Sequence, residues 1–264
     1  MLSYRDLMTG FRKLDLDPGL PILVHASLSV FGNVRSGADT MLGALRLTVD
    51  ALMMPTFTPD AEIIPETGPE NNGILYGSGK DTNRLAAPFK RRDTPAGKMM
   101  GVLAETLRQH PDAERSDHPL LSFAGINVSE ALKTQRLDDP LAPIATLAAQ
   151  GGSVLLLGVD HTTNTAIHLA EQRAGRKTFT RWAVTGSKIV ACTHYPGCSD
   201  GFGAAEQALA PITREVVIGE ARVRALQLAE MLALLTDLFR EEPEALLCER
   251  EDCPRCAAIR KTAG

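Results

Sequence analysis

The chain has 264 residues, of which 44% are hydrophobic and 23% charged, and its formal net charge is −4. A chain of this size and apolar content can bury a large core, which argues against disorder. The net negative charge gives no sign of a basic surface for nucleic acid, and it suits the binding of a polycationic small molecule. No run approaches the roughly 18 apolar residues of a membrane span, and the start MLSYRDLMTG lacks the layout of a signal peptide. We therefore expect a cytoplasmic protein that binds neither nucleic acid nor membrane.

Short apolar runs alternate with longer helical patterns along the chain. In chain order, strands are predicted over residues 21–27, 51–57, 120–126, 153–159 and 186–194, with 214–220 as a further candidate. Helices are predicted from Thr94-Pro95 to about 109, where His110-Pro111 stops the pattern, from about 162 to 175, and over 221–241. This alternation predicts an α/β fold, and we expect a single domain over residues 1–264.

An irregular segment interrupts this pattern. Residues 59–92 are rich in Gly, Pro, Asn and Asp and show little periodicity. We predict a long surface loop, which in a compact domain is often a lid or a binding loop and is therefore the natural place for acceptor recognition. A decorative insertion is the alternative.

A cysteine-containing tail covers about residues 242–264. Cysteines of a cytoplasmic chain are expected to stay reduced, so a disulfide framework is not predicted. The CPRC step can present two thiolates to one structural zinc, while ordinary buried thiols are the alternative. The three tail cysteines are Cys248, Cys253 and Cys256, and the candidates for a fourth ligand are Cys192, Cys198 and His194.

The strongest candidate for catalysis is the segment HTTNTAIHLAEQRAG. On one continuous helix Asn164, His168 and Glu171 would share a face, with His161 near its start. A histidine can take a proton from an amine nucleophile at neutral pH. The strand over 153–159 leads directly into this segment, and open α/β sheets bind ligands at the carboxyl ends of their strands. A capped or salt-bridged structural histidine is the alternative.

A second constellation, VHASLSVFGNVRSGADTMLGAL, reads as a strand, a Ser/Gly-rich turn and a helix. Such a turn aims backbone N–H groups at a helix start, which suits the pyrophosphate or pantetheine arm of a nucleotide-like cofactor. It is neither a Walker loop nor the dinucleotide fingerprint, and a plain connection is the alternative. A third motif, RSDHPLLSFAGI, places His118 just before a strand.

These motifs together resemble the aminoglycoside 3-N-acetyltransferase family. The matching segments occur in order and are VHASLSVFGNVRSGA, MPTF, DTPAGKMMGVLAETLR, RSDHPLLSFAGI and PLAPIATLAAQGGSVLLLGVDHTTNTAIHLAEQRAG. The resemblance implies a three-layer α/β/α domain with a central mixed sheet, distinct from the common GNAT acetyltransferase fold. It also implies an antibiotic-resistance enzyme, a monomer or homodimer, that uses acetyl-coenzyme A as co-substrate.

Site residues are carried over from this resemblance by position. His168 would act as the general base at the reaction centre, with Glu171 and Asn164 beside it, and backbone N–H groups or Ser27 would stabilise the oxyanion. The residues expected to bind the cofactor are His25, Ser27, Leu28, Ser29, Gly32, Val34, Ser36, Gly37, Ala38, Asp93, Thr94, Pro95, His118 and Ser122.

The last third of the chain departs from the family pattern. Many members carry an acidic segment whose glutamate can orient the catalytic histidine, whereas this chain reads THYPGCSDGF. Glu171 or Asp200 could then orient His168, and Cys198 could be an acyl-accepting nucleophile, although direct transfer is preferred.

Three functions remain open on the sequence. The first is acetylation of the 3-amino group of an aminoglycoside, the second acetylation of another amine metabolite, and the third a coenzyme A-binding or zinc-stabilised interaction protein without activity. Carboxylates that could hold ammonium groups of an acceptor are Glu62, Glu66, Glu70, Asp200 and Glu206.

Overall fold

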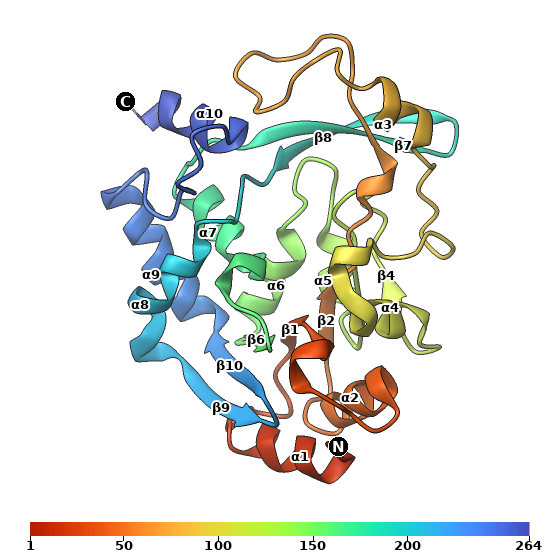
Figure 1. The fold of residues 1–264 in the computed structure, drawn as a ribbon, viewed down its shortest axis with the longest axis vertical. Helices are drawn as coiled ribbons and strands as arrows, with labels where there is room; N and C mark the ends of the chain where they lie inside the picture. Colours follow the sequence, from red (N-terminus) through yellow and green to blue (C-terminus); the bar gives the residue numbers. More distant parts are fainter. Residues whose placement is uncertain (264) are drawn as a thin grey trace.

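A computed structural model describes residues 1–263 and contains a seven-stranded and a three-stranded sheet (Figure 1). The larger sheet has the order β4-β5-β2-β1-β6-β10-β9. Its strands are β1 Ile22–Ala26, β2 Leu52–Pro55, β4 Glu114–Arg115, β5 Phe123–Ile126, β6 Ser153–Leu157, β9 Arg214–Ile218 and β10 Ala221–Gln227. The smaller sheet has the order β3-β7-β8, with β3 Glu62–Ile63, β7 Phe179–Thr185 and β8 Lys188–Tyr195.

Helices cover both faces of the larger sheet. The α-helices are α1 Tyr4–Arg12, α2 Gly37–Arg46, α3 Lys80–Leu85, α4 Gly101–Gln109, α5 Ser129–Thr134, α6 Ala142–Ala149, α7 Ala166–Arg173, α8 Ala205–Leu209, α9 Leu228–Glu241 and α10 Pro254–Ala263. Four short 3-10 helices matter for the site: η1 Leu28–Phe31, η3 Lys98–Met100, η4 His161–Thr163 and η5 Phe202–Ala204. No helix within residues 1–263 is long and apolar enough to cross a membrane.

The sheet is mixed, and its three central strands share one direction. β1 pairs in parallel with both β2 and β6, whereas β5 and β10 run antiparallel to their inner neighbours. The crossover from β1 to its parallel neighbour β2 passes through α2, as parallel strands require. The carboxyl ends of β2, β1 and β6 therefore meet at one edge of the sheet.

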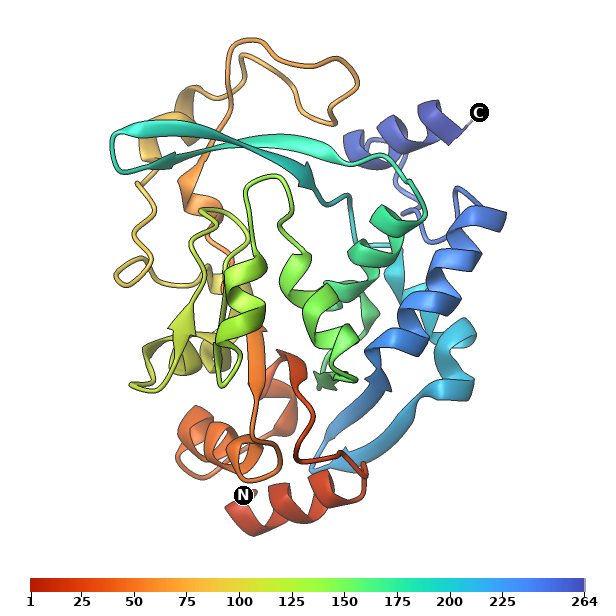
Figure 2. The same cartoon turned by 180° about the vertical axis from the view of Figure 1, so that it is seen from behind.

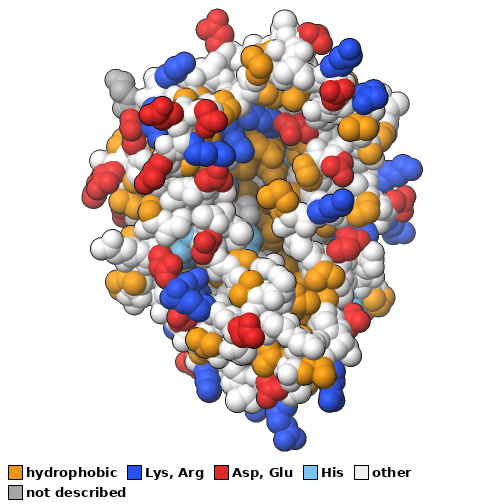
Figure 3. Space-filling model, in the orientation of Figure 1, with side chains coloured by type: hydrophobic (Ala, Val, Ile, Leu, Met, Phe, Trp, Pro, Cys, Tyr) orange, Lys and Arg blue, Asp and Glu red, His pale blue; other side chains and the backbone are white. Residues whose placement is uncertain are grey.

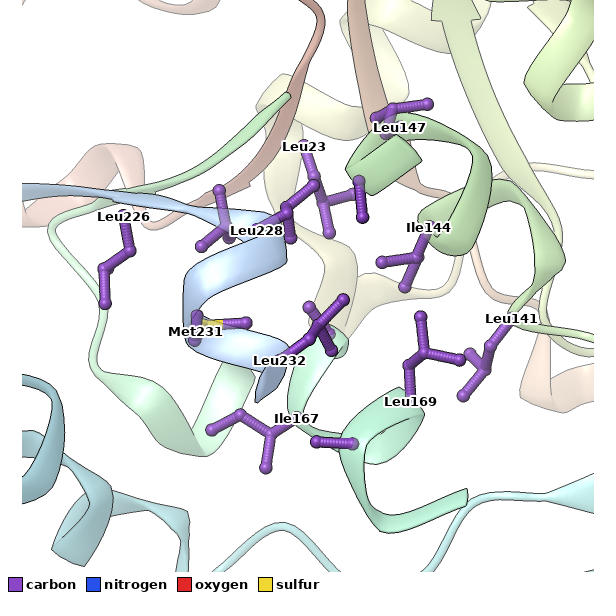
Figure 4. Close-up of a cluster of buried hydrophobic side chains, with 14 of the residues drawn as sticks. Leu23, Leu141, Ile144, Leu147, Ile167, Leu169, Leu226, Leu228, Met231 and Leu232 are labelled. Carbon is purple, nitrogen blue, oxygen red and sulfur yellow. The ribbon is translucent and has the colours of Figure 1, made fainter. Parts of the chain in front are cut away.

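Alternation along the strands divides the core into two layers. Leu23 of β1 and Leu156 of β6 belong to a cluster with α5, α6, α7 and α9, shown in part in Figure 4. Val24 and Leu155 face a second cluster with α1, α2 and α4. The view from behind in Figure 2 has the helices of the first layer in front of the sheet. The predicted three-layer α/β/α fold with a mixed central sheet is thus confirmed.

The three-stranded sheet lies outside these layers. β7 and β8 form a long hairpin that crosses one end of the molecule, next to α10 (Figure 1). The irregular segment 59–92 contributes β3, which pairs with β7, and the short helix α3. Much of this predicted loop is therefore anchored to the hairpin.

One helix prediction was wrong over its first third. Residues 221–227 form strand β10, and only 228–241 form helix α9. The stretch Ala-Arg-Val-Arg-Ala alternates between small apolar and charged residues, which is a strand pattern. Its pairing with β6 and β9 overrides the helical propensity of these residues.

Two other helices begin later than predicted. The segment after Thr94-Pro95 is irregular up to η3, and α4 begins only at Gly101. The segment from 162 divides into η4 and α7, with Asn164 and Thr165 between them. The predicted helix end before His110 is correct.

Candidate active site

A cavity of about 1140 Å³ lies where the carboxyl ends of β1, β2 and β6 meet. His25 and Ala26 end β1 and Ser27 to Val30 follow it, Pro55 ends β2 and Phe57 follows it, and Gly158 to Asp160 follow β6. Segments η3, Tyr195–Gly197 and Ser199–Asp200 line the remaining sides. In the space-filling view a central hollow has a largely hydrophobic interior, with acidic and basic side chains around its rim (Figure 3).

Two glycines allow the chain to turn tightly into this cavity. Gly158, directly after β6, has φ +66°, and an added Cβ would lie 3.2 Å from the carbonyl oxygen of Ser27. Gly101, at the start of α4, has φ +78°, and its Cβ would lie 3.3 Å from the carbonyl oxygen of Ala26. Side chains other than hydrogen would be strained at both positions. These glycines bring the β6 turn and α4 close to the end of β1.

A buried relay holds His168 at the cavity. Its Nδ1 lies 2.6 Å from Oε2 of Glu171, and Oε1 of Glu171 accepts a hydrogen bond of 2.8 Å from Arg176. Arg176 also donates to the carbonyl oxygens of Pro243 and Ala245. Within residues 1–263 no protein group hydrogen-bonds Nε2 of His168, so this nitrogen remains available to a ligand.

The relay decides which carboxylate contacts the histidine. Glu171 lies three residues after His168 on α7, as its spacing predicted. Asp200 instead forms an ion pair of 2.9 Å with Arg250. The ring of His168 packs at 4.8 Å from that of Phe202, which restricts its rotation.

Asn164 and His161 do not share the helical face of His168. His161 begins η4 and Asn164 follows η4 before α7 begins, because the helix predicted from 162 is broken there. The amide of Asn164 contacts His161 at 3.3 Å, and its oxygen accepts the N–H of Ala166. Asn164 still lines the cavity, so it caps the start of α7 within the site.

The predicted cofactor residues separate into two groups. Those that line the cavity are His25, Ser27, Leu28 and Ser29. The backbone N–H groups of Leu28 and Ser29 begin η1, where a helix has no internal acceptors for them. The predicted residues outside the cavity wall are Gly32, Val34, Ser36, Gly37, Ala38, Asp93, Thr94, Pro95, His118 and Ser122.

Ser122 has a place in an internal polar network. Its hydroxyl donates to the carbonyl oxygen of Thr56 and accepts from Arg115, which also donates to the carbonyl oxygen of Thr94. Burial lowers the pKa of Arg115 to about 10. This network joins the end of β2 to the turn around Thr94.

Two buried histidines differ chemically from His168. Burial lowers the pKa of His25 to about 3 and that of His118 to about 4, so both rings are neutral at physiological pH. Nδ1 of His118 accepts the N–H groups of Leu120 and Leu121, which places its proton on Nε2. These histidines are suited to hydrogen bonding rather than to accepting a proton.

Several cavity residues were not predicted. Arg222 and Arg224 of β10 line one side, and Arg224 is held by Glu215 and by the carbonyl oxygen of Val159. They were assigned to a helix, which hid their place in the sheet. Alternating arginines beside a Gly turn are the signal that could have revealed them. The other unpredicted lining residues with polar or sulfur-containing side chains include Lys98, Met99, Met100, Asp160, Glu220 and Arg255.

Cys198 does not line the cavity, although its neighbours Gly197 and Ser199 do. Burial raises the pKa of this thiol to about 11, so it is protonated at neutral pH. Nucleophilic attack needs the thiolate, and the geometry gives no support to an acyl-cysteine. His194 is also turned elsewhere, with Nδ1 at 2.6 Å from the carbonyl oxygen of Asp138.

Comparisons with known proteins agree with this architecture. The family model described as aminoglycoside 3-N-acetyltransferase matches residues 23–240. An aminoglycoside N(3')-acetyltransferase-like protein from the SPbeta prophage of Bacillus subtilis is 32% identical over 178 residues, which cover 64% of each chain. Aminoglycoside N(3)-acetyltransferase III of Salmonella sp is also 32% identical, over 65% of this chain and 60% of that protein. The matched region thus spans less than two thirds of these curated relatives.

Solved structures extend the similarity over nearly the whole chain. Aminoglycoside acetyltransferase AAC(3)-IVa, as apoenzyme, gives a TM-score of 0.80 at 25% identity and covers 98% of this chain and 97% of its own. The AAC-IIIb complex with CoASH gives a TM-score of 0.75 at 23% identity, over 91% of this chain and 97% of its own. The extent of the family match and the shared fold show that the chain belongs to the aminoglycoside 3-N-acetyltransferase family.

Proposed function

We propose that this protein is a cytoplasmic enzyme that transfers the acetyl group of acetyl-coenzyme A to the 3-amino group of an aminoglycoside, with His168 as the general base. The observation that carries the proposal is the relay at the cavity: Nδ1 of His168 is held by Glu171, while Nε2 has no protein hydrogen-bond partner among residues 1–263. A carboxylate on one ring nitrogen fixes the tautomer that accepts a proton at the other.

The chemistry follows from that geometry. Nε2 of His168 takes a proton from the acceptor nitrogen as this nitrogen attacks the thioester carbonyl. The C–N bond forms, the C–S bond breaks, and the coenzyme A thiolate takes up a proton from the imidazolium. The unpaired N–H groups of Leu28 and Ser29, with the hydroxyl of Ser27, are the candidates to stabilise the oxyanion.

The charges around the cavity support two ligands of opposite sign. Lys98, Arg222 and Arg255 would attract the phosphates of coenzyme A, whereas Asp160 and Asp200 would attract the ammonium groups of the acceptor. The relative AAC-IIIb is described in complex with CoASH, and variants of AAC(3)-IVa in complex with a gentamicin and with apramycin. These complexes support the proposed pair of ligands.

Two alternatives share parts of this site. Another amine metabolite could be acetylated at the same site, since His168 would interact only with the nucleophilic nitrogen of the acceptor. A coenzyme A-binding protein without activity would keep the β1–η1 segment but would not need the His168–Glu171–Arg176 chain. The presence of all three side chains in one buried hydrogen-bonded series favours an enzyme.

The test measures coenzyme A release from acetyl-coenzyme A with gentamicin, kanamycin, neomycin and apramycin. The wild type is expected to turn over at least one drug, and His168→Ala to lose about 10²–10⁴-fold in kcat. His110→Ala is the matched control, because His110 is remote from the cavity and contacts Arg46. Calorimetric binding of acetyl-coenzyme A, unchanged in His168→Ala, shows that the variant is folded.

Each outcome selects one function. Turnover of a non-drug amine but of no aminoglycoside would move the assignment to the metabolite enzyme. Binding of acetyl-coenzyme A without release of coenzyme A thiol in the presence of any amine would support the non-catalytic alternative. Full activity of His168→Ala would overturn the proposed base.

A further inference from the structure

Four buried cysteines lie together next to the active-site cavity but outside it. Cys198 belongs to the loop after β8, Cys248 to the segment after α9, and Cys253 and Cys256 to the start of α10. All four are free and at most 3% exposed, and their Sγ atoms lie within 4.8 Å of one another. Cys198 supplies the fourth sulfur, whereas Cys192 and His194 lie elsewhere.

The spacing of the sulfurs fits a tetrahedron. Zinc–thiolate bonds of about 2.3 Å place tetrahedral sulfurs about 3.8 Å apart. The Sγ atoms of Cys248 and Cys256 lie 3.4 Å apart, far beyond the ~2.05 Å of a disulfide. The two-residue gap between Cys253 and Cys256 at a helix start is a typical zinc-ligand step. We propose that Cys198, Cys248, Cys253 and Cys256 form a closed structural zinc site.

The surroundings supply little other reason for burying four thiols. Within the described chain only Leu247 among the apolar side chains packs against the cluster, so it is not an extension of the main core.

Two arginine side chains lie near the cysteines, where they can offset the negative charge of a metal–thiolate cluster. Arg250 lies between Cys248 and Cys253 in the chain and pairs with Asp200 at 2.9 Å. Arg260 donates to the carbonyl oxygen of Cys248 at 2.8 Å. A cluster of four thiolates around Zn²⁺ carries two net negative charges, and such outer contacts stabilise it.

The site would join the tail to the wall of the cavity. Gly197, Ser199 and Asp200 line the cavity on either side of Cys198. Arg255, between two of the other cysteines, lines it as well and donates to the carbonyl oxygen of Gly197 at 2.9 Å. Zinc at the cluster would therefore fix the position of this loop, an effect on activity that rests on the proposed function.

The experiment uses the full chain, purified without a histidine tag or chelator. Metal analysis by mass spectrometry is expected to find one zinc per chain, and cobalt substitution is expected to give the charge-transfer and visible bands of tetrahedral thiolate coordination. Cys256→Ser should lower zinc to well below one equivalent. Cys192→Ser is the matched control, because Cys192 is equally buried but lies outside the cluster, and it should keep its zinc.

A titration of the wild type avoids the risk that a variant fails to fold. An organomercurial should release zinc, detected with a chromogenic chelator, in proportion to the modification of four thiols. Absence of zinc after growth in zinc-supplemented medium, cobalt spectra without thiolate bands, or a Cys253–Cys256 disulfide in the native protein would each overturn the proposal. None of these readouts depends on acetyl transfer, so failure of the proposed function leaves the metal test intact.

Discussion

The two walls of the active-site cavity are built in different ways. The strand-end wall, formed by the carboxyl ends of β1, β2 and β6 with α7, rests on the two large hydrophobic clusters. The outer wall, formed by the β7–β8 hairpin, residues 196–200 and α10, rests on three small clusters, one of them made of cysteines. The proposed proton-transfer groups, His168 and Glu171, stand on the first wall. The second wall is held by ion pairs and by the contacts of the cysteine cluster.

The largest expected effect concerns the anchor of the strand-end wall. Arg176→Met removes the cation that pairs with buried Glu171 and stacks on Phe239 at 4.1 Å. Removing one partner of a buried ion pair costs about 3–5 kcal/mol, so the free energy of unfolding in urea should fall by that amount. The value of kcat should fall more than KM changes, because Arg176 positions Glu171 without touching substrate.

The control for this substitution is an exposed ion pair. Arg240→Met breaks a pair with Asp237 in which both side chains are largely exposed, and it should change stability by less than about 1 kcal/mol. Equal effects of the two substitutions would mean that the buried chain does not anchor this wall.

A second prediction compares the cores of the two walls directly. Leu156→Ala in β6 should lower the free energy of unfolding by about 2–5 kcal/mol, because the cavity it leaves cannot collapse within the sheet. Ile259→Ala in α10 removes a side chain of similar burial from a small cluster. Its effect in the same denaturation experiment should be less than half as large, with earlier proteolysis of the tail. Similar losses would show that both walls unfold as one unit.

A third prediction uses the pH dependence of His118, a buried side chain outside the cavity wall. The pKa of His118 is about 4 in the folded chain against 6.5 when unfolded, so the unfolded state binds its proton first. Stability is therefore retained above pH 6.5 and lost as the pH falls to about 4, at about 1.4 kcal/mol per pH unit for this group. His118→Asn keeps an acceptor for the N–H groups of Leu120 and Leu121 but does not titrate.

The variant should thus lose less stability than the wild type between pH 6.5 and 4, by up to about 3 kcal/mol. Denaturation curves at half-unit pH steps measure this difference. Parallel curves for the two proteins would show that His118 is protonated equally in both states.

The smallest expected effect lies at the rim of the outer wall. Asp200→Asn removes a carboxylate that lines the cavity and pairs with exposed Arg250. The KM for an aminoglycoside should rise a few-fold, since partly exposed charges contribute about 0–1 kcal/mol each. Binding of acetyl-coenzyme A should not change. Glu66→Gln serves as the comparison because Glu66 lies on the segment 59–92 outside the cavity, and an equal rise in KM there would assign acceptor binding to that loop.

The strand-end wall could be predicted from the sequence because its signals are local. The apolar runs of β1, β2 and β6 are short and bounded by turn residues, and the spacing of three between His168 and Glu171 brings both to one face of α7. Asn164 was misplaced because a break at Asn164–Thr165 separates η4 from α7, and no periodicity reveals such a break.

The outer wall could not be predicted in the same way because its contacts join distant parts of the chain. Cys198 meets tail cysteines at least fifty positions away, and nothing in the sequence chooses it over Cys192. Arg224 was hidden because β10 acquires its strand identity only from pairing with β6. Contacts between distant parts of the chain, rather than local propensity, determine both the fourth cysteine of the cluster and the strand β10.

The reversal of strand direction on either side of β2, β1 and β6 separates the two edges at which these strands end. The connections that leave the three strands line the cavity, together with the loop after β8 and the β9–β10 hairpin. Connections at the opposite edge, such as the turn around Pro18 and the Gly151–Gly152 step, are tied to neighbouring backbone far from the chemistry. Insertions at the opposite edge should therefore disturb the cavity less than insertions in the segments that line it.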